Sequence, residues 1–198
     1  MNLCELTTVK TVLGVWDSGD DSELERLIGP AGDLFDRFCN RSFERAATVV
    51  QEFRGDETEI SMGRYPIESV SKFELKSDET TGWVEVAGGV CLIRRACVLE
   101  LPAALGGASQ QARVTYAGGY VLPGSTPTVG QTSLPKDVEN AAIEQVVFWY
   151  RNRNKSGLSS VSGDGASIGY EGKSVVTPLP LLPIVQGSLE PYRRILLG

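Results

Sequence analysis

Two motifs that could carry catalytic chemistry overlap in one glycine-rich stretch, SGDGASIGYEGKS at residues 162–174. Within it, GASIG at residues 165–169 fits G-x-S-x-G, the sharp strand-to-helix turn that exposes the nucleophilic serine of one hydrolase fold. A serine hydroxyl stays inert until a base removes its proton, and in that arrangement the base is a histidine. The chain contains no histidine. The composition therefore excludes a Ser-His-Asp triad built on Ser167.

The same stretch ends in GKS at residues 172–174, which resembles the end of a phosphate-binding P-loop. The full motif has a glycine five positions before its final glycine, and Ser167 occupies that position. A P-loop also requires a helix directly after it, because helix amides and the helix dipole hold the phosphates. Pro178, Pro180 and Pro183 oppose such a helix. The stretch is therefore predicted to be a mobile loop followed by a short extended tail.

Two weaker hydrolytic alternatives stay open. The run SVSK at residues 69–72 fits S-x-x-K, but it lies in an alternating, strand-like segment, and the chain contains neither S-D-N nor K-T-G to complete such a site. A pair of carboxylates could act as in glycosidases, although a solvated strand face or turn explains the candidate positions better. Those positions are Glu52, Glu57, Glu59 and Glu74.

The overall composition predicts a folded protein, made in the cytosol, that binds no metal and no cofactor. Its 198 residues are 41% hydrophobic, which is enough for one well-cored domain. The formal charge of −6 argues against the broad basic surface of a nucleic-acid-binding protein. No apolar run approaches the roughly 18 residues of a membrane span, and the N-terminus lacks a secretory-signal pattern. The four cysteines, with no histidine in the chain, do not form a zinc motif.

The order of the predicted elements indicates an α+β fold that forms one domain overall. Residues 1–44 are expected to be helices of the core, and residues 45–120 an inserted antiparallel β region. Residues 121–157 are expected to hold a linker and the main core helix, and residues 158–198 a flexible loop and an extended C-terminal arm. These limits follow from a change of apolar period between helix-like and strand-like spacing.

The N-terminal helices have local start and stop signals. One of the two threonines at residues 7–8 could cap a short helix that ends at Gly14. Ser22 and Glu25 fit a capping box for a second helix. The Gly-Pro pair at residues 29–30 is expected to kink that helix or break it into two segments.

The β region is predicted from short runs rich in β-branched and aromatic residues, separated by turn signals such as Gly55-Asp56 and Gly88-Gly89. The alternation indicates a compact antiparallel sheet or a small barrel. The runs are TVVQEF, TEISM, VSKFEL, WVEV, VCLI, CVLEL and ARVTY.

The main helix, KDVENAAIEQVVFWYRNRN, is expected to start at Pro135 and is apolar along two stripes. A helix that is apolar on two sides needs two surfaces to bury against, of which the second could be the β region or a neighbouring copy. Arginines at its end suit the helix dipole, or could pair with an acidic face of that copy. The candidates for subunit contacts are Ile143, Val147, Tyr150, Arg151 and Arg153.

The C-terminal segment PLPLLPIVQGSLEPYRRILLG combines prolines that favour an extended conformation with apolar, tyrosine and arginine side chains typical of protein interfaces. It could pack back onto the chain's own core, or it could be an arm that docks on a partner. The candidate contact residues of such an arm are Leu179, Leu181, Leu182, Ile184, Pro191, Tyr192, Arg193, Arg194 and Ile195.

Read in order, several short phrases make the chain resemble the head-to-tail connector proteins (adaptor or head completion proteins) of tailed bacteriophages. The resemblance covers most of the chain, although no single phrase is diagnostic. The phrases are FCNRSF at 38–43, RYPIESV at 64–70, VTYAGGY at 114–120, LP at 134–135, WYRNR at 149–153 and PYRR at 191–194.

This resemblance implies a structural virion protein without enzymatic activity, made in the host cytoplasm and located in the virion neck. Its helical connector core would form a ring of about a dozen copies under the portal. The arm at residues 178–197 would reach the portal, other surfaces would meet neck or tail proteins, and DNA would pass through without sequence-specific binding. The protein would bind no membrane.

Other functions stay open beside the adaptor. A neck stopper or tail-completion protein is the nearest alternative. A DNA-binding protein would need a basic stripe from Arg151, Arg153, Lys155, Arg193 and Arg194. A hydrolase would need a reactive Ser167 or a carboxylate pair.

Overall fold

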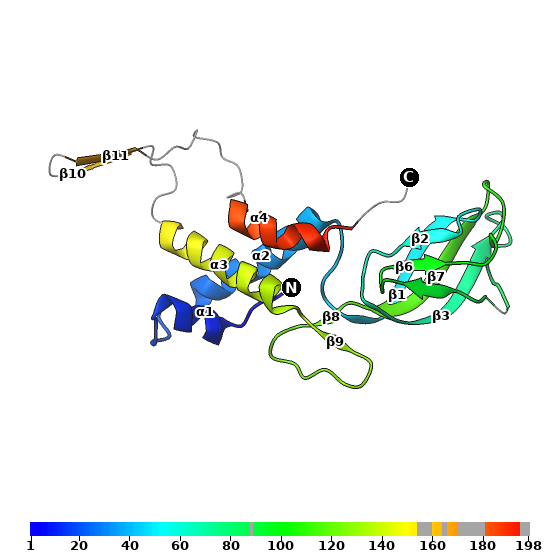
Figure 1. Ribbon diagram of the computed structural model, residues 1–198, viewed down its shortest axis with the longest axis horizontal. Helices are drawn as coiled ribbons and strands as arrows, with labels where there is room; N and C mark the ends of the chain where they lie inside the picture. Colours follow the sequence, from blue (N-terminus) through cyan, green and yellow to red (C-terminus); the bar gives the residue numbers. More distant parts are fainter. Residues whose placement is uncertain (88, 154–159, 164–165, 170–180, 195–198) are drawn as a thin grey trace.

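The computed structural model describes residues 1–87, 89–153, 160–163, 166–169 and 181–194, and it confirms the α+β class. Figure 1 shows an elongated molecule with two parts, a helical body on the left and a β lobe on the right. The body contains the helices α1 Leu6–Leu13, α2 Asp21–Cys39, α3 Lys136–Asn152 and α4 Pro183–Leu189.

The first helix ends as predicted but begins differently. Gly14 adopts a left-handed conformation, with φ of 72°, and its N–H donates back to the last turn of α1. Such a C-cap is natural for glycine because it lacks a Cβ atom. The predicted threonine cap at residues 7–8 is wrong, since α1 already starts at Leu6 and Glu5 at its N-cap makes no side-chain capping bond.

The second helix corrects the predicted capping box and rules out the break, one of the two alternatives expected at the Gly-Pro pair. It begins at Asp21 with Asp20 as N-cap, so Ser22 lies inside the first turn and no capping box forms. It also runs through Pro30 as one element rather than breaking there. Proline removes one backbone hydrogen bond, and the apolar residues Ile28 and Ala31 on either side are buried in the same core, which holds the helix together.

The third helix is the centre of the body because α1, α2 and α4 all pack against it. Pro135 is its N-cap rather than its first residue, and Asp137 and Glu139 lie in its first turn, where carboxylates favour the helix dipole. The two apolar stripes predicted for this helix are both buried within the chain. Its buried residues are Val138, Glu139, Ala141, Ala142, Ile143, Gln145, Val146, Val147, Trp149 and Tyr150.

The β lobe contains all seven predicted strands, arranged in two antiparallel sheets with a core of their own. One sheet has the order β1-β7-β3-β4 and the other the order β2-β6-β5. Alternating burial along β7 explains the strand-like period of its sequence. The strands are β1 Ala46–Arg54, β2 Glu59–Ser61, β3 Ile67–Lys76, β4 Trp83–Glu85, β5 Leu92–Arg94, β6 Val98–Glu100 and β7 Gln111–Gly118.

The two ends of the β lobe lie side by side at the point where the lobe joins the helical body. Tyr120 N–H donates to the Phe43 carbonyl at 2.7 Å, and Arg45 N–H donates to the Tyr120 carbonyl at 2.9 Å. The linker that follows contains a short parallel pair, β8 Tyr120–Val121 with β9 Thr132–Ser133. Between these two strands runs the exposed loop at the bottom of Figure 1.

The glycine-rich stretch is partly β structure, which corrects the prediction of a loop. Strands β10 Ser160–Gly163 and β11 Ala166–Gly169 form an antiparallel hairpin, with Ser167 opposite Ser162. Ser167 therefore lies in a strand rather than at a strand-to-helix turn. The GKS run at 172–174 lies outside the described residues.

The C-terminal segment is helical where an extended arm was predicted. Pro183 is the first residue of α4, and a 3-10 helix, Glu190–Tyr192, follows it. Proline is tolerated in the first helical turn because that N–H has no helical partner. Pro178 and Pro180 lie outside the described residues.

Candidate assembly surfaces

The C-terminal segment, residues 181–194, packs on the helical body. Leu181, Val185 and Leu189 recur every four residues and are buried in the core around α3. The buried Gln145 of α3 accepts a hydrogen bond from the N–H of Leu182 at 3.0 Å. Of the two outcomes left open by the sequence, the described part of this segment therefore shows packing onto the chain's own core.

The opposite side of α4 faces solvent. Ile184 is 65% exposed, and Pro191 and Arg193 are exposed as well. Leu182, Tyr192 and Arg194 are half-buried. Leu179 and Ile195, also predicted for the arm, lie outside the described residues.

The end of this segment bridges the helical body and the β lobe, at a junction that we call the seam. Tyr192 Oη donates to the Asp137 carboxylate of α3 at 2.8 Å, while Tyr65 Oη of the lobe donates to the Tyr192 carbonyl at 2.8 Å. Arg194 N–H donates to the Cys39 carbonyl at 2.8 Å, and its Nη2 donates to the Ser61 carbonyl at 2.5 Å. Tyr192 and Arg194 thus tie the C-terminal segment to α2 and α3 of the body and to residues 61–65 of the lobe.

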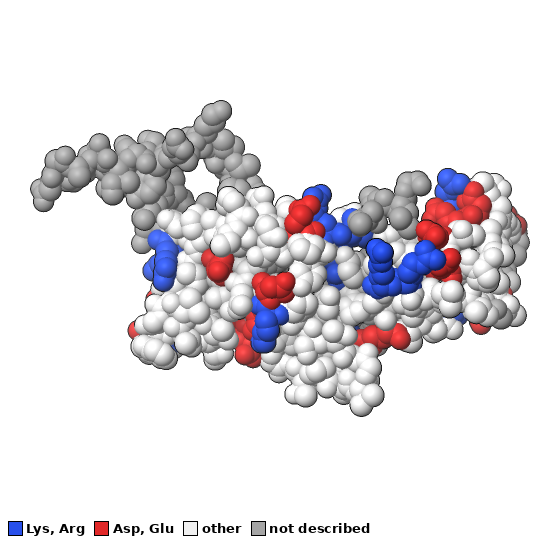
Figure 2. All heavy atoms as spheres, in the orientation of Figure 1, with Lys and Arg blue, Asp and Glu red and all other residues white. Residues whose placement is uncertain are grey.

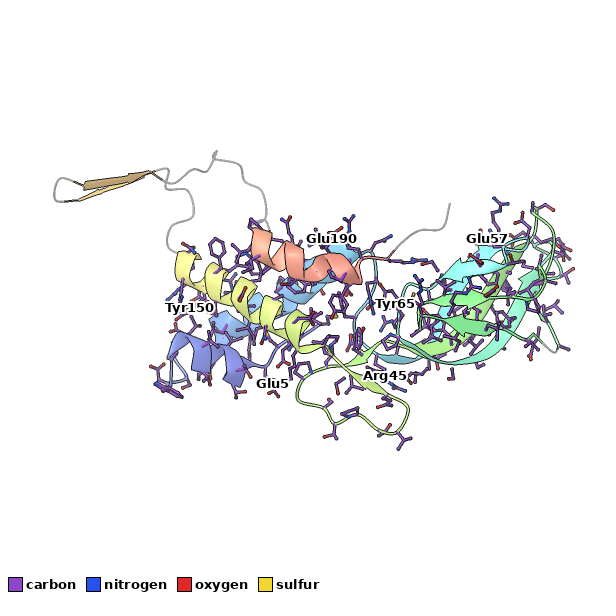
Figure 3. The ribbon with its side chains drawn as sticks, viewed as in Figure 1. Glu5, Arg45, Glu57, Tyr65, Tyr150 and Glu190 are labelled. Atoms are coloured by element: carbon purple, nitrogen blue, oxygen red, sulfur yellow. The ribbon has the colours of Figure 1, made fainter. Side chains whose placement is uncertain are left out.

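Figure 3 places Tyr65 between the body and the lobe, with Glu190 above it at the end of α4. Burial, and then the hydrogen bond to Asp137, raise the pKa of Tyr192, so its hydroxyl stays protonated as a donor. Burial likewise raises the pKa of Tyr65. Both seam tyrosines therefore remain neutral hydrogen-bond donors across the ordinary pH range.

A buried arginine lies at the centre of the seam. Arg41 is 5% exposed, and its guanidinium carbon lies 3.2 Å from the centroid of the Tyr65 ring and 4.6 Å from that of Phe43. Its Nη2 donates to the Tyr65 carbonyl, whereas Nε and Nη1 have no hydrogen-bond partner among the described residues. The faces of aromatic rings therefore contribute to the stabilisation of this charge, beside the one hydrogen bond.

Sequence reasoning placed Asp137 only in the first turn of the main helix, and named Arg41 only within the family-like phrase FCNRSF, beside the phrases RYPIESV, VTYAGGY and PYRR. The structure brings residues from all four phrases together at the seam. Figure 2 shows Lys and Arg side chains gathered in the middle of this face, where the body meets the lobe.

Most of the residues predicted for subunit contacts at α3 make contacts within the chain instead. Ile143, Val147 and Tyr150 are buried against the chain's own elements, and Tyr150 Oη donates to Asp20 at 2.5 Å. Arg153 pairs with Glu23 at 3.3 Å, and Arg151 is exposed. Of these five residues, Arg151 is thus the most open to solvent. Contacts between copies stay a prediction.

The candidate catalytic groups are brought together only in part: Glu52, Glu57 and Glu59 line one open cavity of about 200 Å³ together with Arg194, and Glu74 does not line it. Lys72 of the S-x-x-K run pairs with Glu74 at 3.2 Å, within strand β3. Glu74 itself is buried rather than solvated, because Arg113 donates to both of its oxygens at 2.8 and 2.9 Å. In the part of the chain that the structure describes, no three His, Cys, Asp or Glu side chains form a group that could hold a metal ion.

Within the same described ranges, no helix has both the length and the apolar character needed to cross a membrane.

Three solved structures resemble this fold over nearly the whole chain. A chain in "Neck of empty GTA particle computed with C6 symmetry" matches with a TM-score of 0.60 at 12% identity. A chain in "Virion of native gene transfer agent (GTA) particle" matches with 0.57 at 14%, and one in "Neck of native GTA particle computed with C12 symmetry" with 0.50 at 16%. Each alignment covers 98% of this chain and 90% of the other. No curated protein sequence matches.

A helical body with an inserted β lobe, closed by its C-terminal segment, therefore defines a fold that is also found in phage-like particles. The model of the family described as "Head completion protein" matches residues 2–195. The chain belongs to the head completion protein family, which confirms the resemblance noted in the sequence and assigns it a structural role in the virion.

Proposed function

We propose that this protein is a head-tail connector that forms a ring under the portal, in the virion neck, and lets DNA pass from capsid to tail. The observation that carries the proposal is the family match over residues 2–195, joined to the likeness of the whole fold to chains of neck structures computed with C6 and C12 symmetry. A ring fits such symmetry because identical contacts repeat around the axis.

The electrostatics favour a conduit over a DNA-binding protein. The formal charge is −6, and several arginines, such as Arg45, Arg113 and Arg153, are paired with carboxylates within the chain rather than free to bind phosphates. A protein that grips duplex DNA releases counterions through many Lys and Arg contacts, which would oppose sliding. A channel wall of low positive charge lets DNA move through it.

The portal contact would use the solvent side of the C-terminal segment. Leu181, Val185 and Leu189 anchor the segment, so that Ile184, Pro191 and Arg193 can be offered to a partner. Many such small contacts around a ring act together, because each bound copy raises the effective concentration of the next.

The decisive experiment measures native mass over a concentration series, for the protein alone and mixed with its portal. Portal-bound rings of about a dozen copies are expected. Ile184→Asp should weaken portal binding. Val129→Asp should not, although Val129, in the loop between β8 and β9, is even more exposed to solvent than Ile184. A wild-type monomer that ignores the portal would contradict the adaptor and favour the stopper, tail-completion or DNA-binding alternatives.

A further inference from the structure

The helical body and the β lobe are connected through one neck. Each has a hydrophobic core of its own, and among the described residues the two cores have no member in common. The chain enters the lobe at residues 43–45 and leaves it at residues 118–120, where backbone hydrogen bonds hold the two passages side by side. Two parts joined in this way are expected to move relative to each other unless a larger contact holds them.

The end of the C-terminal segment supplies a further connection between the two parts. Helix α4 anchors the segment in the core of the body, and residues 190–194, which we call the strap, continue from α4 toward the lobe (Figure 1). There the Tyr192 carbonyl accepts a hydrogen bond from Tyr65 Oη, and Arg194 Nη2 donates to the Ser61 carbonyl. The strap is thus bonded to the lobe at two points.

The same two residues of the strap also bond to the body. Tyr192 Oη donates to the Asp137 carboxylate, and Arg194 N–H donates to the Cys39 carbonyl, both at 2.8 Å. The ring of Tyr192 lies beside that of Phe43, with 6.2 Å between the two centroids. The strap can make all of these contacts at once only when the lobe and the body keep one relative orientation.

The charges at the end of the strap favour the same orientation. Arg194 lines an open cavity of about 200 Å³ to which the lobe contributes Glu52, Glu57 and Glu59. Glu59 also pairs with Arg94 at 3.6 Å, and among the described residues Arg194 forms no direct ion pair. The attraction between Arg194 and these carboxylates therefore acts across the cavity and adds modestly to the hydrogen bonds.

The outer side of the strap is open to solvent, since Pro191 and Arg193 are exposed. We propose that the strap locks the β lobe onto the helical body, and that a partner bound to its outer side thereby sets the orientation of the lobe. A ligand shifts a conformational equilibrium by its difference in affinity for the two states, and Pro191 and Arg193 keep this arrangement only while the strap is in place. The partner part of this inference rests on the proposed portal contact, whereas the lock does not.

The test is the amide hydrogen exchange of Ser42, whose N–H donates to the Gly63 carbonyl of the lobe at 2.8 Å. Ser42 lies just after α2 of the body, so this bond opens when the lobe turns, and the exchange rate reports how often it opens. Arg194→Met combined with Tyr65→Phe removes the hydrogen bonds between strap and lobe and should speed the exchange about 30-fold or more. Tyr65→Phe alone should speed it about 5-fold.

Arg193→Met is the matched control, because Arg193 pairs with Glu190 inside the strap at 2.9 Å and makes no ion pair with the described residues of the lobe. It should leave the exchange of Ser42 unchanged. Amides of β7 should exchange as in the wild type in every variant, which distinguishes turning of the lobe from loss of its fold. Unchanged Ser42 exchange in the double variant, or an equal acceleration by Arg193→Met, would overturn the lock.

A second measurement addresses the partner. Hydrogen exchange read by mass spectrometry in the peptide spanning residues 41–45 should slow when the wild-type protein binds its portal, because the bound partner holds the strap in place. Unchanged exchange in a complex that does form would overturn the partner part and leave the portal contact intact. A protein that shows the lock when free but ignores its portal would contradict the proposed function and leave the lock intact.

Discussion

Arg41 is a buried charge that lies among aromatic rings. Its guanidinium is buried at the seam over Tyr65, and two of its nitrogens have no hydrogen-bond partner among the described residues. A buried ion without full pairing adds little net stability compared with an apolar side chain of the same volume. A planar, weakly hydrated guanidinium tolerates this setting better than an ammonium does.

We therefore expect Arg41→Lys to destabilise the protein more than Arg41→Met. The lysine variant should lose about 2–3 kcal/mol of unfolding free energy, because its ammonium stays buried and cannot stack. The methionine variant should stay within about 1.5 kcal/mol of wild type, because it fills the space without a charge. Urea titration of the three proteins measures both values. The reverse order would mean that the charge itself holds the seam.

Glu74 gives a pH-dependent prediction. The hydrogen bonds from Arg113 lower the pKa of this carboxyl in the folded state. Its stabilisation is therefore fully present above its unfolded pKa of about 4.3 and is lost as pH falls through the lower folded value. Glu74→Gln should cost about 1 kcal/mol at pH 7 and less at pH 3.

Urea titrations at the two pH values check this expectation. Glu79→Gln is the matched control, because Glu79 pairs with Lys76 at 2.6 Å but its side chain is 90% exposed. It should change the unfolding free energy little at either pH. An equal cost of Glu74→Gln at pH 7 and pH 3 would contradict the role of the ion pair.

At the scale of elements, the period of the sequence predicts the strands well and the helix ends poorly. All seven strand runs between residues 45 and 120 form strands, because alternation follows directly from having one buried face. Where a helix starts depends on a few backbone angles. A sequence pattern therefore cannot tell which of two similar N-cap candidates, such as Asp20 and Ser22, the helix uses. Helix α4 was missed because a segment of seven residues that begins with a proline, with two more prolines upstream, forms a helix only when α3 buries its apolar side.

Substitution by alanine should change the stability of the protein in opposite directions at two glycines that both have open space around them. Gly14 caps α1 with φ of 72°, whereas Gly187 lies inside α4 without a positive φ, and a Cβ atom at either would meet nothing within 4 Å. Gly14→Ala should destabilise the protein by about 1 kcal/mol, because alanine resists the left-handed conformation. Gly187→Ala should stabilise it by about 0.5–1 kcal/mol through helix propensity. Thermal unfolding measures both, and shifts of the same sign would contradict the reasoning.

At the scale of the molecule, the chain has two hydrophobic cores that share no residue. One lies in the helical body and the other in the β lobe. The sequence predicted the lobe as an insertion but not which of its faces meets the helices. That relation depends on Arg41, Tyr65 and Tyr192 meeting across long sequence separations, and no local pattern encodes such a meeting.

We expect residues 44–120 to fold alone, because they contain the whole second core and their ends already lie together at Tyr120 and Arg45. A fragment of this range should unfold in a single cooperative urea transition, with dispersed amide NMR signals in water. Tyr65→Ala within the fragment should matter less than in the full chain, since its partners on the helical body are absent. A fragment that stays unfolded would mean that the seam is required for the lobe to form.

The position of the insertion also sets an order of events during translation. Helices α1 and α2 are synthesised first, yet α3, which covers their apolar faces, follows only after the complete β lobe has emerged. Domains fold as they leave the ribosome, so the lobe should be finished while α1 and α2 still lack their partner. Nascent chains stalled at Asn152, when the lobe has emerged and α3 is still inside the ribosomal exit tunnel, should therefore protect the lobe from protease and leave α1 and α2 open to cleavage. The oldest part of the nascent chain would be the last to become native.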